Sequence, residues 1–447
     1  MNSLGYDVFC LEGIVAREKG CAGVNAMTTC SLCQSDQIEV LIDLGLQPVS
    51  SHFVASTDAP TVTHPLALAL CHACSLVQLS RPFPYRDLTP PFDWITYREP
   101  ETHLDDVVAR LIKFLPTGRG LAAMGTSFKD DTTLERLRQH DVTKAWTINA
   151  SADLGADRPN AGIESVQGLL TQDKAASLRV ERGPVDVLVA RHILEHCEAP
   201  RQFLAALGEI LAPDGLLMLE VPDCSGNLER QDYSMIWEEH ASYFTRTTLR
   251  RMVAAAGFEI LGIEPYQFRF EDVFVVFARK LASGARSEDA VEVAQDIALA
   301  QTYGAAFEDW TQRYRRAIDQ LMHGSKPVAA YGAGHLTAAF VNFHGLADRF
   351  AFIVDDTPQK QGLSLPGTGL PIVPRERLTP GAVSACLFGL SPDVEDKIIA
   401  NNSAYVSGGG KFYSMFVDST RSIRSLCQPD RKAVSGDNGI AASLPAG

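Results

Sequence analysis

The sequence has no apolar run that could cross a bilayer, and it has few basic residues for its length. A membrane-spanning helix needs about 18 consecutive apolar residues, and no stretch of the 447-residue chain approaches that length. The amino terminus also lacks the apolar region of a signal peptide. Lys and Arg number 40 against 54 Asp and Glu, a net charge of -14, so nucleic-acid phosphates would be repelled. We therefore expect a cytoplasmic protein with a small-molecule partner, no membrane partner and no nucleic-acid partner.

Four of the ten cysteines stand in two closely spaced pairs, Cys30-x-x-Cys33 and Cys71-x-x-Cys74. Each pair fits a tight turn that places two thiolates on one cation, and two such turns complete a tetrahedral zinc site. Protein thiolates then fill all four coordination positions, so the zinc is predicted to be structural. The alternative is a set of reduced or redox-active cysteines, as expected in a reducing compartment.

The length and the apolar pattern predict several α/β units. A chain of 447 residues is too long for one core, and about three domains are expected. From residue 120 onward, apolar runs typical of buried strands alternate with helical patterns. The predicted strands and helices of the first unit are Gly120–Met124, Thr132–Gln139, Thr143–Asn149, Val185–Ala190, Pro200–Leu211 and Leu216–Glu220. A small, polar linker is predicted at 280–287, followed by a long helical stretch to about His323.

The segment Ile236–Phe244, IWEEHASYF, follows the apolar run Leu216–Pro222. In an open α/β sheet the ligand lies beyond the carboxyl ends of the strands, so residues after such a strand can reach it. His240 can act as a base near neutral pH, and Glu239 can orient its ring and raise its basicity. The alternative is the start of a surface helix in which His240 contacts only water.

A second α/β unit is predicted from Val328 onward, where AAYGAGHLTAAF has the form of a strand, a glycine turn and a helix. The backbone N–H groups of Gly332, Ala333 and Gly334 are predicted to approach a phosphate, with His335 beside it, because a helix amino terminus suits an anion. The alternative is a glycine turn needed only for close packing of strand and helix. The short GAG is a weak glycine signature for a dinucleotide.

Several segments together resemble the zinc-containing C-methyltransferases that act on nucleotide-linked deoxysugars, over roughly residues 28–420. The two Cys pairs, with LIDLGLQPVSSHF between them and CHACSLVQL closing them, are similar to the zinc-binding domain of that family. VDVLVARHILEHCEAPRQFLAALGEILAPDGLLMLEVPD resembles the later half of its S-adenosylmethionine-binding domain. IWEEHASYF resembles its active-site segment, E-H-x-S-Y-F, and AAYGAGHLTAAFVN with DDTPQKQGLSLPGTGLPI resembles its carboxy-terminal domain.

The resemblance implies an α/β fold of three domains. These are an N-terminal zinc-binding domain, a central Rossmann-like class I methyltransferase domain and a C-terminal Rossmann-like α/β domain. We expect them at residues 28–98, 99–281 and 282–426, with an extension over 1–27 and a disordered tail over 427–447.

The resemblance also implies the activity, a carbon methylation in natural-product biosynthesis. A ketone on the sugar acidifies the neighbouring C–H, His240 removes that proton with Glu239 beside it, and the resulting enolate takes the methyl group of S-adenosylmethionine. Tyr97 and Tyr243 are the hydroxyls expected to donate to the enolate oxygen.

The cofactor segment departs from the family pattern. We expect S-adenosylmethionine at Gly125, Thr126 and Ser127, near Asn149 and beneath Arg191-His192, but the turn MGTSFKDDTTL keeps a single glycine. Asn149 stands where an acidic residue normally binds the ribose hydroxyls. Beside the base, Trp237 and Glu238 replace the tyrosine and histidine usual in the family.

Two alternatives follow from these departures. A family member with a degenerate cofactor loop would bind or isomerise a sugar nucleotide without methyl transfer. A nicotinamide-dependent oxidoreductase would use Tyr331–His335 as a dinucleotide turn, although the fuller glycine fingerprint is missing.

Overall fold

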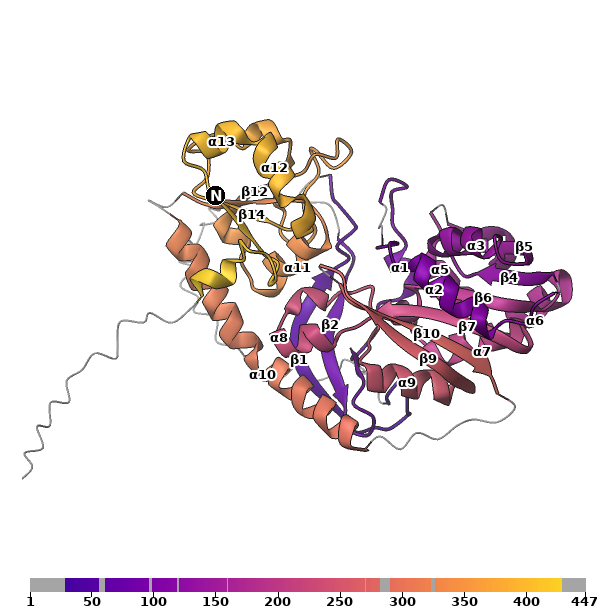
Figure 1. Ribbon diagram of the computed structural model, residues 1–447. Helices are drawn as coiled ribbons and strands as arrows, with labels where there is room; N and C mark the ends of the chain where they lie inside the picture. The colour runs from indigo at the N-terminus through magenta and orange to yellow at the C-terminus, as the bar shows by residue number, and fades with distance from the viewer. Residues whose placement is uncertain are drawn as a thin grey trace, which may run out of the picture.

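The computed structural model describes residues 29–55, 61–95, 99–118, 120–158, 160–269, 271–281, 290–322 and 326–427. The predicted extension over 1–27, Tyr97 and nearly all of the predicted tail therefore lie outside the described residues. Figure 1 shows three bodies, each built on its own β-sheet. In the described part of the chain, no helix is long and apolar enough to cross a membrane.

The amino-terminal sheet has four antiparallel strands in the order β1-β2-β3-β8. They are β1 (Ile38–Pro48), β2 (Thr63–Cys71), β3 (Val77–Leu79) and β8 (Ser242–Tyr243). The segment between the two Cys pairs thus forms β1 and most of β2, and the second pair forms the turn between β2 and β3. The fourth strand comes from the predicted methyltransferase range and crosses over to this sheet.

The central sheet has the order β5-β4-β6-β7-β10-β9, in which the first four strands are parallel and the last two are antiparallel. Its strands are β4 (Leu121–Gly125), β5 (Val142–Thr147), β6 (Val185–Arg191), β7 (Leu211–Pro222), β9 (Phe258–Tyr266) and β10 (Val273–Lys280). Its helices are α2 (Leu104–Leu111), α3 (Asp131–Leu137), α4 (Ala150–Leu154), α5 (Ile163–Leu169), α6 (Gln172–Arg182), α7 (Pro200–Ile210) and α9 (Arg246–Ala255). This is the doubly wound α/β arrangement that the sequence predicts.

Helices cover both faces of this sheet because successive side chains of a strand point to opposite faces. In β6, Leu188 and Ala190 pack with α4 to α7 and α9, whereas Val187 and Val189 pack with α2 and α3. The apolar run VDVLVA is therefore apolar on both faces, as expected of a buried parallel strand. The shorter helices α1 (Tyr85–Leu88) and α8 (Ser225–Arg230) lie outside this core.

Element boundaries differ from the predicted ones where caps and turns intervene. Helix α2 ends at Leu111, where a 3-10 turn over Ile112–Phe114 follows before the next strand. The strand predicted to reach Asn149 ends at Thr147, because Asn149 caps the next helix.

The carboxy-terminal sheet is parallel throughout, in the order β13-β12-β11-β14-β15. Its strands are β11 (Val328–Tyr331), β12 (Phe350–Val354), β13 (Ile372–Val373), β14 (Cys386–Phe388) and β15 (Phe412–Ser414). Its helices are α11 (His335–Phe343), α12 (Glu395–Asn401) and α13 (Ser403–Ser407).

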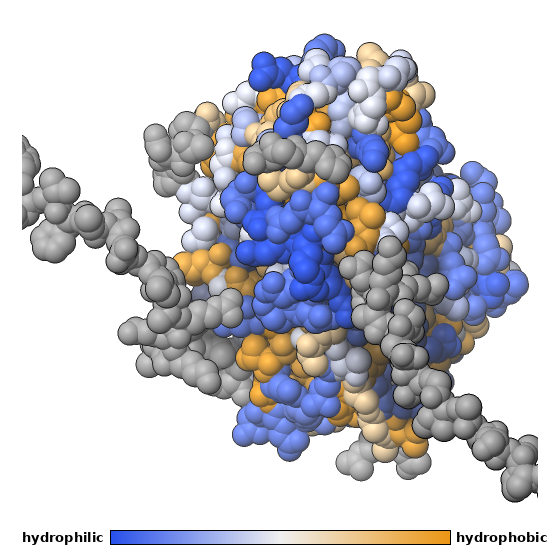
Figure 2. Space-filling model, turned by 90° about the vertical axis from the view of Figure 1, so that its left-hand side faces the viewer, coloured by the Kyte–Doolittle hydropathy of each residue, from blue (hydrophilic) through white to orange (hydrophobic). Residues whose placement is uncertain are grey.

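Helix α10 (Ala290–Leu321) joins the carboxy-terminal body to the amino-terminal sheet (Figure 1). Its inner face carries Tyr303, whose hydroxyl donates to the carbonyl of Asp232 at 3.1 Å, while the Tyr233 hydroxyl donates to the Tyr303 carbonyl at 3.0 Å. Its outer face is polar, with Glu308 and Gln312 exposed, and Figure 2 shows hydrophilic residues gathered across the middle of this side of the molecule. The helix thereby fixes the segment that leads into IWEEHASYF.

Candidate functional site

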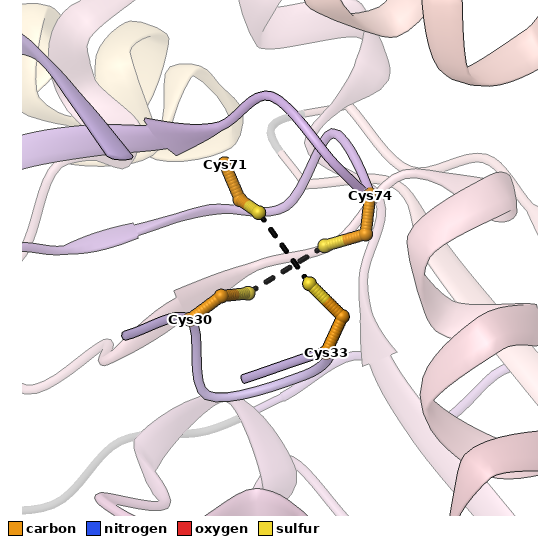
Figure 3. Close-up of side chains that lie close together, drawn as sticks. All are labelled: Cys30, Cys33, Cys71 and Cys74. Atoms are coloured by element: carbon orange, nitrogen blue, oxygen red, sulfur yellow. Dashed lines mark hydrogen bonds between the residues drawn. The ribbon is translucent and has the colours of Figure 1, made fainter. Parts of the chain in front are cut away.

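The four predicted zinc ligands converge on one point (Figure 3). The Sγ atoms of Cys30 and Cys74 lie 3.5 Å apart, and so do those of Cys33 and Cys71. Four thiolates around zinc at about 2.3 Å would be about 3.8 Å from one another. The spacing and the all-sulfur donor set therefore fit a tetrahedral zinc ion with no position left for water.

Each Cys pair is held by a tight turn. The N–H of Gln34 donates to the carbonyl of Cys30, and the N–H of Ser75 donates to that of Cys71. Gln34 and Ser75 both adopt positive φ angles, 62° and 64°, which allow the chain to reverse after the second cysteine. The two turns are therefore matching halves of one site.

Two cavities lie next to each other at the carboxyl ends of β4 and β6. Cavity A, of about 240 Å³, is lined by His192, Glu195, His240 and His335 among others. Cavity B, of about 350 Å³, is lined by Phe92 and Ile95 and by the segment 160–164, among others. Lys129, His196 and Trp237 line both cavities. Ligands of open α/β sheets bind at this edge.

His240 lies at the wall of cavity A, at the end of a turn in which its N–H donates to the Trp237 carbonyl. Its ring centroid is 4.7 Å from that of His196 and 4.8 Å from that of Trp237. Burial, followed by electrostatic interaction with the nearby rings of His196 and His335, holds the pKa of His240 well below its ordinary value. The imidazole is therefore neutral at pH 7 and has a lone pair that can accept a proton. The predicted alternative of a solvent-exposed histidine is wrong.

Glu195 is a buried acid beside this base that the sequence analysis missed. Its side chain is 1% exposed, and neither carboxylate oxygen has a hydrogen-bond partner in the described residues. A Glu195 oxygen lies within 4.8 Å of ring nitrogens of His196 and His240. This carboxylate is placed to stabilise a proton on His240. The pair Glu195-His196, two polar residues just after a buried strand, was the signal that could have identified it.

Glu239 does not hold the ring of His240 as predicted. It lines cavity B, where one of its oxygens lies within 4.8 Å of Glu164 and His196, and its Oε1 has no partner in the described part of the structure. Because the chain turns between Trp237 and His240, the adjacent side chains of Glu239 and His240 face different cavities. Burial and the charges of Glu164 and Glu238 hold the pKa of Glu239 well above its ordinary value.

Tyr243 also has a role different from the predicted one. Its hydroxyl accepts from the N–H of Trp237 and donates to the carbonyl of the same residue, both at 3.1 Å. The side chain is buried in the core shared with the amino-terminal sheet. Tyr243 therefore fixes the backbone of the base segment, and its hydroxyl is not placed at the wall of either cavity. Tyr97, the other predicted donor, lies outside the described residues.

The predicted cofactor loop is filled by the chain itself. One oxygen of Asp130 accepts from the N–H groups of Thr126 and Ser127 at 2.7 and 3.1 Å and from the Thr126 hydroxyl at 2.8 Å. The other oxygen accepts from the N–H of Arg191 at 2.9 Å. A Cβ on Gly125 would lie 2.8 Å from that of Asp130, so glycine is needed there for the internal contact. The loop amides predicted to bind the cofactor are already satisfied.

Asn149 serves as a helix cap. Its side-chain oxygen accepts from the N–H groups of Ser151 and Ala152 at 3.1 and 2.9 Å. The residue is exposed and lines neither cavity. The predicted contact of this oxygen with a ribose is therefore replaced by a contact within the chain.

Arg191 and His192 differ in their surroundings. Arg191 is buried against Glu220, with Nε 2.9 Å from its carboxylate, so it supports the site from behind. His192 reaches cavity A, and its Nε2 lies 2.9 Å from the other oxygen of Glu220. Burial alone would lower the pKa of His192, but the charge of Glu99, the carboxylate of Glu195 3.6 Å from Nδ1 and the hydrogen bond with Glu220 hold it well above its ordinary value.

In the carboxy-terminal domain, only His335 of the four predicted residues reaches a cavity. The N–H of Gly332 donates to the Val354 carbonyl and that of Ala333 to Asp355, so these amides are not available for a phosphate. Gly332 has a φ of 102°, and a Cβ there would lie 3.1 Å from the Gly389 carbonyl oxygen. Gly332 is therefore needed for the close approach of this turn to Gly389, which follows β14. Gly334 precedes α11, where an added Cβ would meet open space.

Three family descriptions match consecutive parts of the chain. Residues 30–88 match a zinc binding domain, residues 125–262 match a methyltransferase domain, and residues 277–416 match a C-methyltransferase C-terminal domain. Together they cover the three bodies of Figure 1 in order.

One relative matches nearly from end to end. The C-methyltransferase NovU of Streptomyces niveus is 24% identical over 409 residues, which covers 87% of this chain and 95% of the relative. Among solved structures, a methyltransferase of Aquifex aeolicus dependent on S-adenosylmethionine is 15% identical, covering 44% of this chain and 97% of its own, with a TM-score of 0.26. The 1,6-didemethyltoxoflavin-N1-methyltransferase of Burkholderia thailandensis is 16% identical, covering 40% and 79%, with a TM-score of 0.26.

The zinc site gives the first prediction. Purified protein should contain about one zinc per chain by metal analysis, and Cys71→Ser should lose it and melt at a lower temperature, because metal-binding energy is folding energy here. Cys427→Ser, far from the cluster, is the control and should keep its zinc. A Cys71→Ser protein with full zinc content and an unchanged melting temperature would mean that the ligands are misassigned.

Proposed function

The chain is a C-methyltransferase dependent on S-adenosylmethionine, with a structural zinc site, and we propose that it methylates the carbon next to a ketone of a nucleotide-linked deoxysugar. The base in this proposal is His240. The observation that carries it is that His240 lines one cavity, while a second cavity adjoins the first across Lys129, His196 and Trp237. Acceptor and cofactor would then meet between the two.

Cavity B is our proposed site for the cofactor. Its volume of about 350 Å³ lies within the usual range of ligand pockets. S-adenosylmethionine carries a sulfonium and an ammonium group, and this cavity offers the carboxylates of Glu164 and Glu239, the second with an oxygen free of partners in the described structure. The donor set therefore fits a cationic ligand. When bound, the cofactor supplies an electrophilic methyl group.

Cavity A is our proposed site for the keto sugar. A ring nitrogen of His240 takes the proton from the carbon next to the ketone, and the C–H electron pair moves into the enolate. His240 accepts this proton as a neutral imidazole, and the nearby Glu195 carboxylate stabilises the imidazolium that forms. Because burial disfavours the charged imidazolium, this stabilisation by Glu195 is needed.

The enolate oxygen requires a donor at the same site. The Tyr97 hydroxyl is our proposal, because Glu99, two residues further along the chain, lines cavity A. Tyr243 does not serve as this donor, because its hydroxyl is hydrogen-bonded to the Trp237 backbone.

The carboxy-terminal domain completes cavity A. His335 lies at the start of α11, and its ring is 4.6 Å from that of Trp237. Leu336 and Phe416 line the same cavity from this domain. We propose that the domain holds the acceptor through His335 and these apolar contacts, which replaces the predicted phosphate contact of the glycine turn.

His240→Asn tests the base. Loss of a general base typically lowers the rate by about two to four powers of ten, so this variant should lose most turnover and still bind S-adenosylmethionine in calorimetry. It should also stop the exchange of the acceptor's acidic hydrogen with solvent deuterium, followed by NMR on the keto sugar nucleotide alone. His140→Asn, at an exposed site, should exchange at the parent rate. Undiminished exchange in His240→Asn would assign the base to another group.

Glu239→Gln tests the cofactor placement. The substitution keeps the shape of the side chain and removes the negative charge that Glu239 carries beside a bound cation. It should therefore weaken binding of the sulfonium form more than binding of S-adenosylhomocysteine, whose thioether sulfur is uncharged. We expect the preference for S-adenosylmethionine in calorimetry to fall on the order of tenfold. Glu135→Gln, an exposed control, should leave the preference unchanged. Equal preference in Glu239→Gln and parent would place the cofactor elsewhere.

A further inference from the structure

The carboxylate of Asp130 occupies the loop after β4, where other methyltransferases of this fold bind the cofactor. In a methyltransferase of this fold, a glycine-rich turn brings backbone N–H groups close to the methionine part of the cofactor, and such groups favour a carboxylate. Here the amides of Thr126 and Ser127 donate to Asp130, whose side chain is fully buried. A carboxylate from outside would have to displace Asp130 or lie against its negative charge.

Asp130 is well held in this position. Its two oxygens together accept three backbone N–H bonds and one hydroxyl bond. Burial raises the pKa of Asp130 to about 6, opposed by the hydrogen bonds from Thr126 and the charge of Arg191. The cofactor's carboxylate therefore needs another partner.

Lys129, the residue before Asp130, is placed to be that partner. It lines both cavities, at the place where they adjoin. Among the described residues that line cavity B, it is the one with a permanent positive charge. Its backbone carbonyl accepts from Arg191 Nη1 at 2.7 Å, so the network around Asp130 also fixes the position of Lys129.

The contact with Glu99 does not use all the N–H donors of the Lys129 ammonium group. Its Nζ lies 2.5 Å from Glu99 Oε1, and an ammonium group has three N–H donors. Burial would raise the pKa of Glu99, but the charges of His192 and Lys129 lower it to about 2. Glu99 thus has a second cation in His192, and Lys129 can share its charge with another carboxylate.

We propose that the Lys129 ammonium binds the α-carboxylate of S-adenosylmethionine, in place of the loop amides that Asp130 occupies. This inference rests on the cofactor placement in cavity B given above. In this proposal the Lys129 side chain recognises the amino-acid part of the cofactor, a role that the glycine-rich turn has in other methyltransferases of this fold.

The test compares two ligands that differ by one carboxylate, S-adenosylhomocysteine and its decarboxylated analogue, by calorimetry on the full chain. The parent should prefer S-adenosylhomocysteine about tenfold or more, the size of a charge-assisted hydrogen bond. Lys129→Met combined with Glu99→Gln removes the ion pair without leaving a buried charge unpaired, and it should abolish most of this preference. Lys129→Arg and Glu99→Gln alone should keep it, and so should Lys113→Met at an exposed site.

The outcomes separate this inference from the proposed function. A double variant that keeps the parental preference for S-adenosylhomocysteine would overturn the role of Lys129. If Glu239→Gln still behaves as expected, the placement of the cofactor in cavity B would stand. A parent that binds both ligands equally would show that the carboxylate is not recognised at all, which also overturns the inference. A parent that binds neither ligand would overturn the placement and the inference together.

Discussion

The position of His240, the proposed base, depends on two backbone hydrogen bonds of its neighbour Ala241. The Ala241 carbonyl accepts from the N–H of Leu79 at 3.0 Å, and the Ala241 N–H donates to the Glu195 carbonyl at 2.7 Å. The first bond continues the pairing of β3 with β8, and β3 begins just after the Cys71–Cys74 turn. The zinc site therefore adjoins the strand on which the segment carrying His240 is fixed. The second bond ties the same segment to the loop that carries Glu195.

Buried charge is the other constraint on this site. Charges removed from water are tolerated when they are paired and hydrogen-bonded, and Arg191, His192 and His103 all surround Glu220. Burial would raise the pKa of Glu220, but the hydrogen bonds with His103 and His192 and the charges of His192 and Arg191 hold it well below its ordinary value. Glu195 is less well satisfied, since its Oε1 lies 3.6 Å from Nδ1 of His192 and neither oxygen has a hydrogen-bond partner in the described chain. An unsatisfied buried carboxylate is costly, and it is understandable where a proton or a ligand is to be received.

The sequence predicted what is encoded locally and failed where tertiary contacts decide. The Cys-x-x-Cys turns and the apolar run of β6 depend on neighbours in the chain, so the zinc ligands and the central sheet were accessible. Asn149 is followed by Ser151 at a helix start, and its capping role could have been predicted from that pattern. Glu239 was predicted to hold His240 because the two residues are adjacent in the sequence. The turn between Trp237 and His240 instead places the Glu239 side chain at cavity B. Glu195 and Lys129 approach His240 only once the sheet has formed.

The filled loop after β4 explains how the fold tolerates the loss of its glycine signature. Buried backbone N–H groups require acceptors. In a glycine-rich loop, the bound ligand is the acceptor. Asp130 supplies the acceptor from within the chain, so this loop is ordered before any ligand arrives. Gly125 is retained because Asp130 needs the space beside it. In the proposed placement the cofactor gains nothing from satisfying the amides, and its affinity would come from the side chains around cavity B.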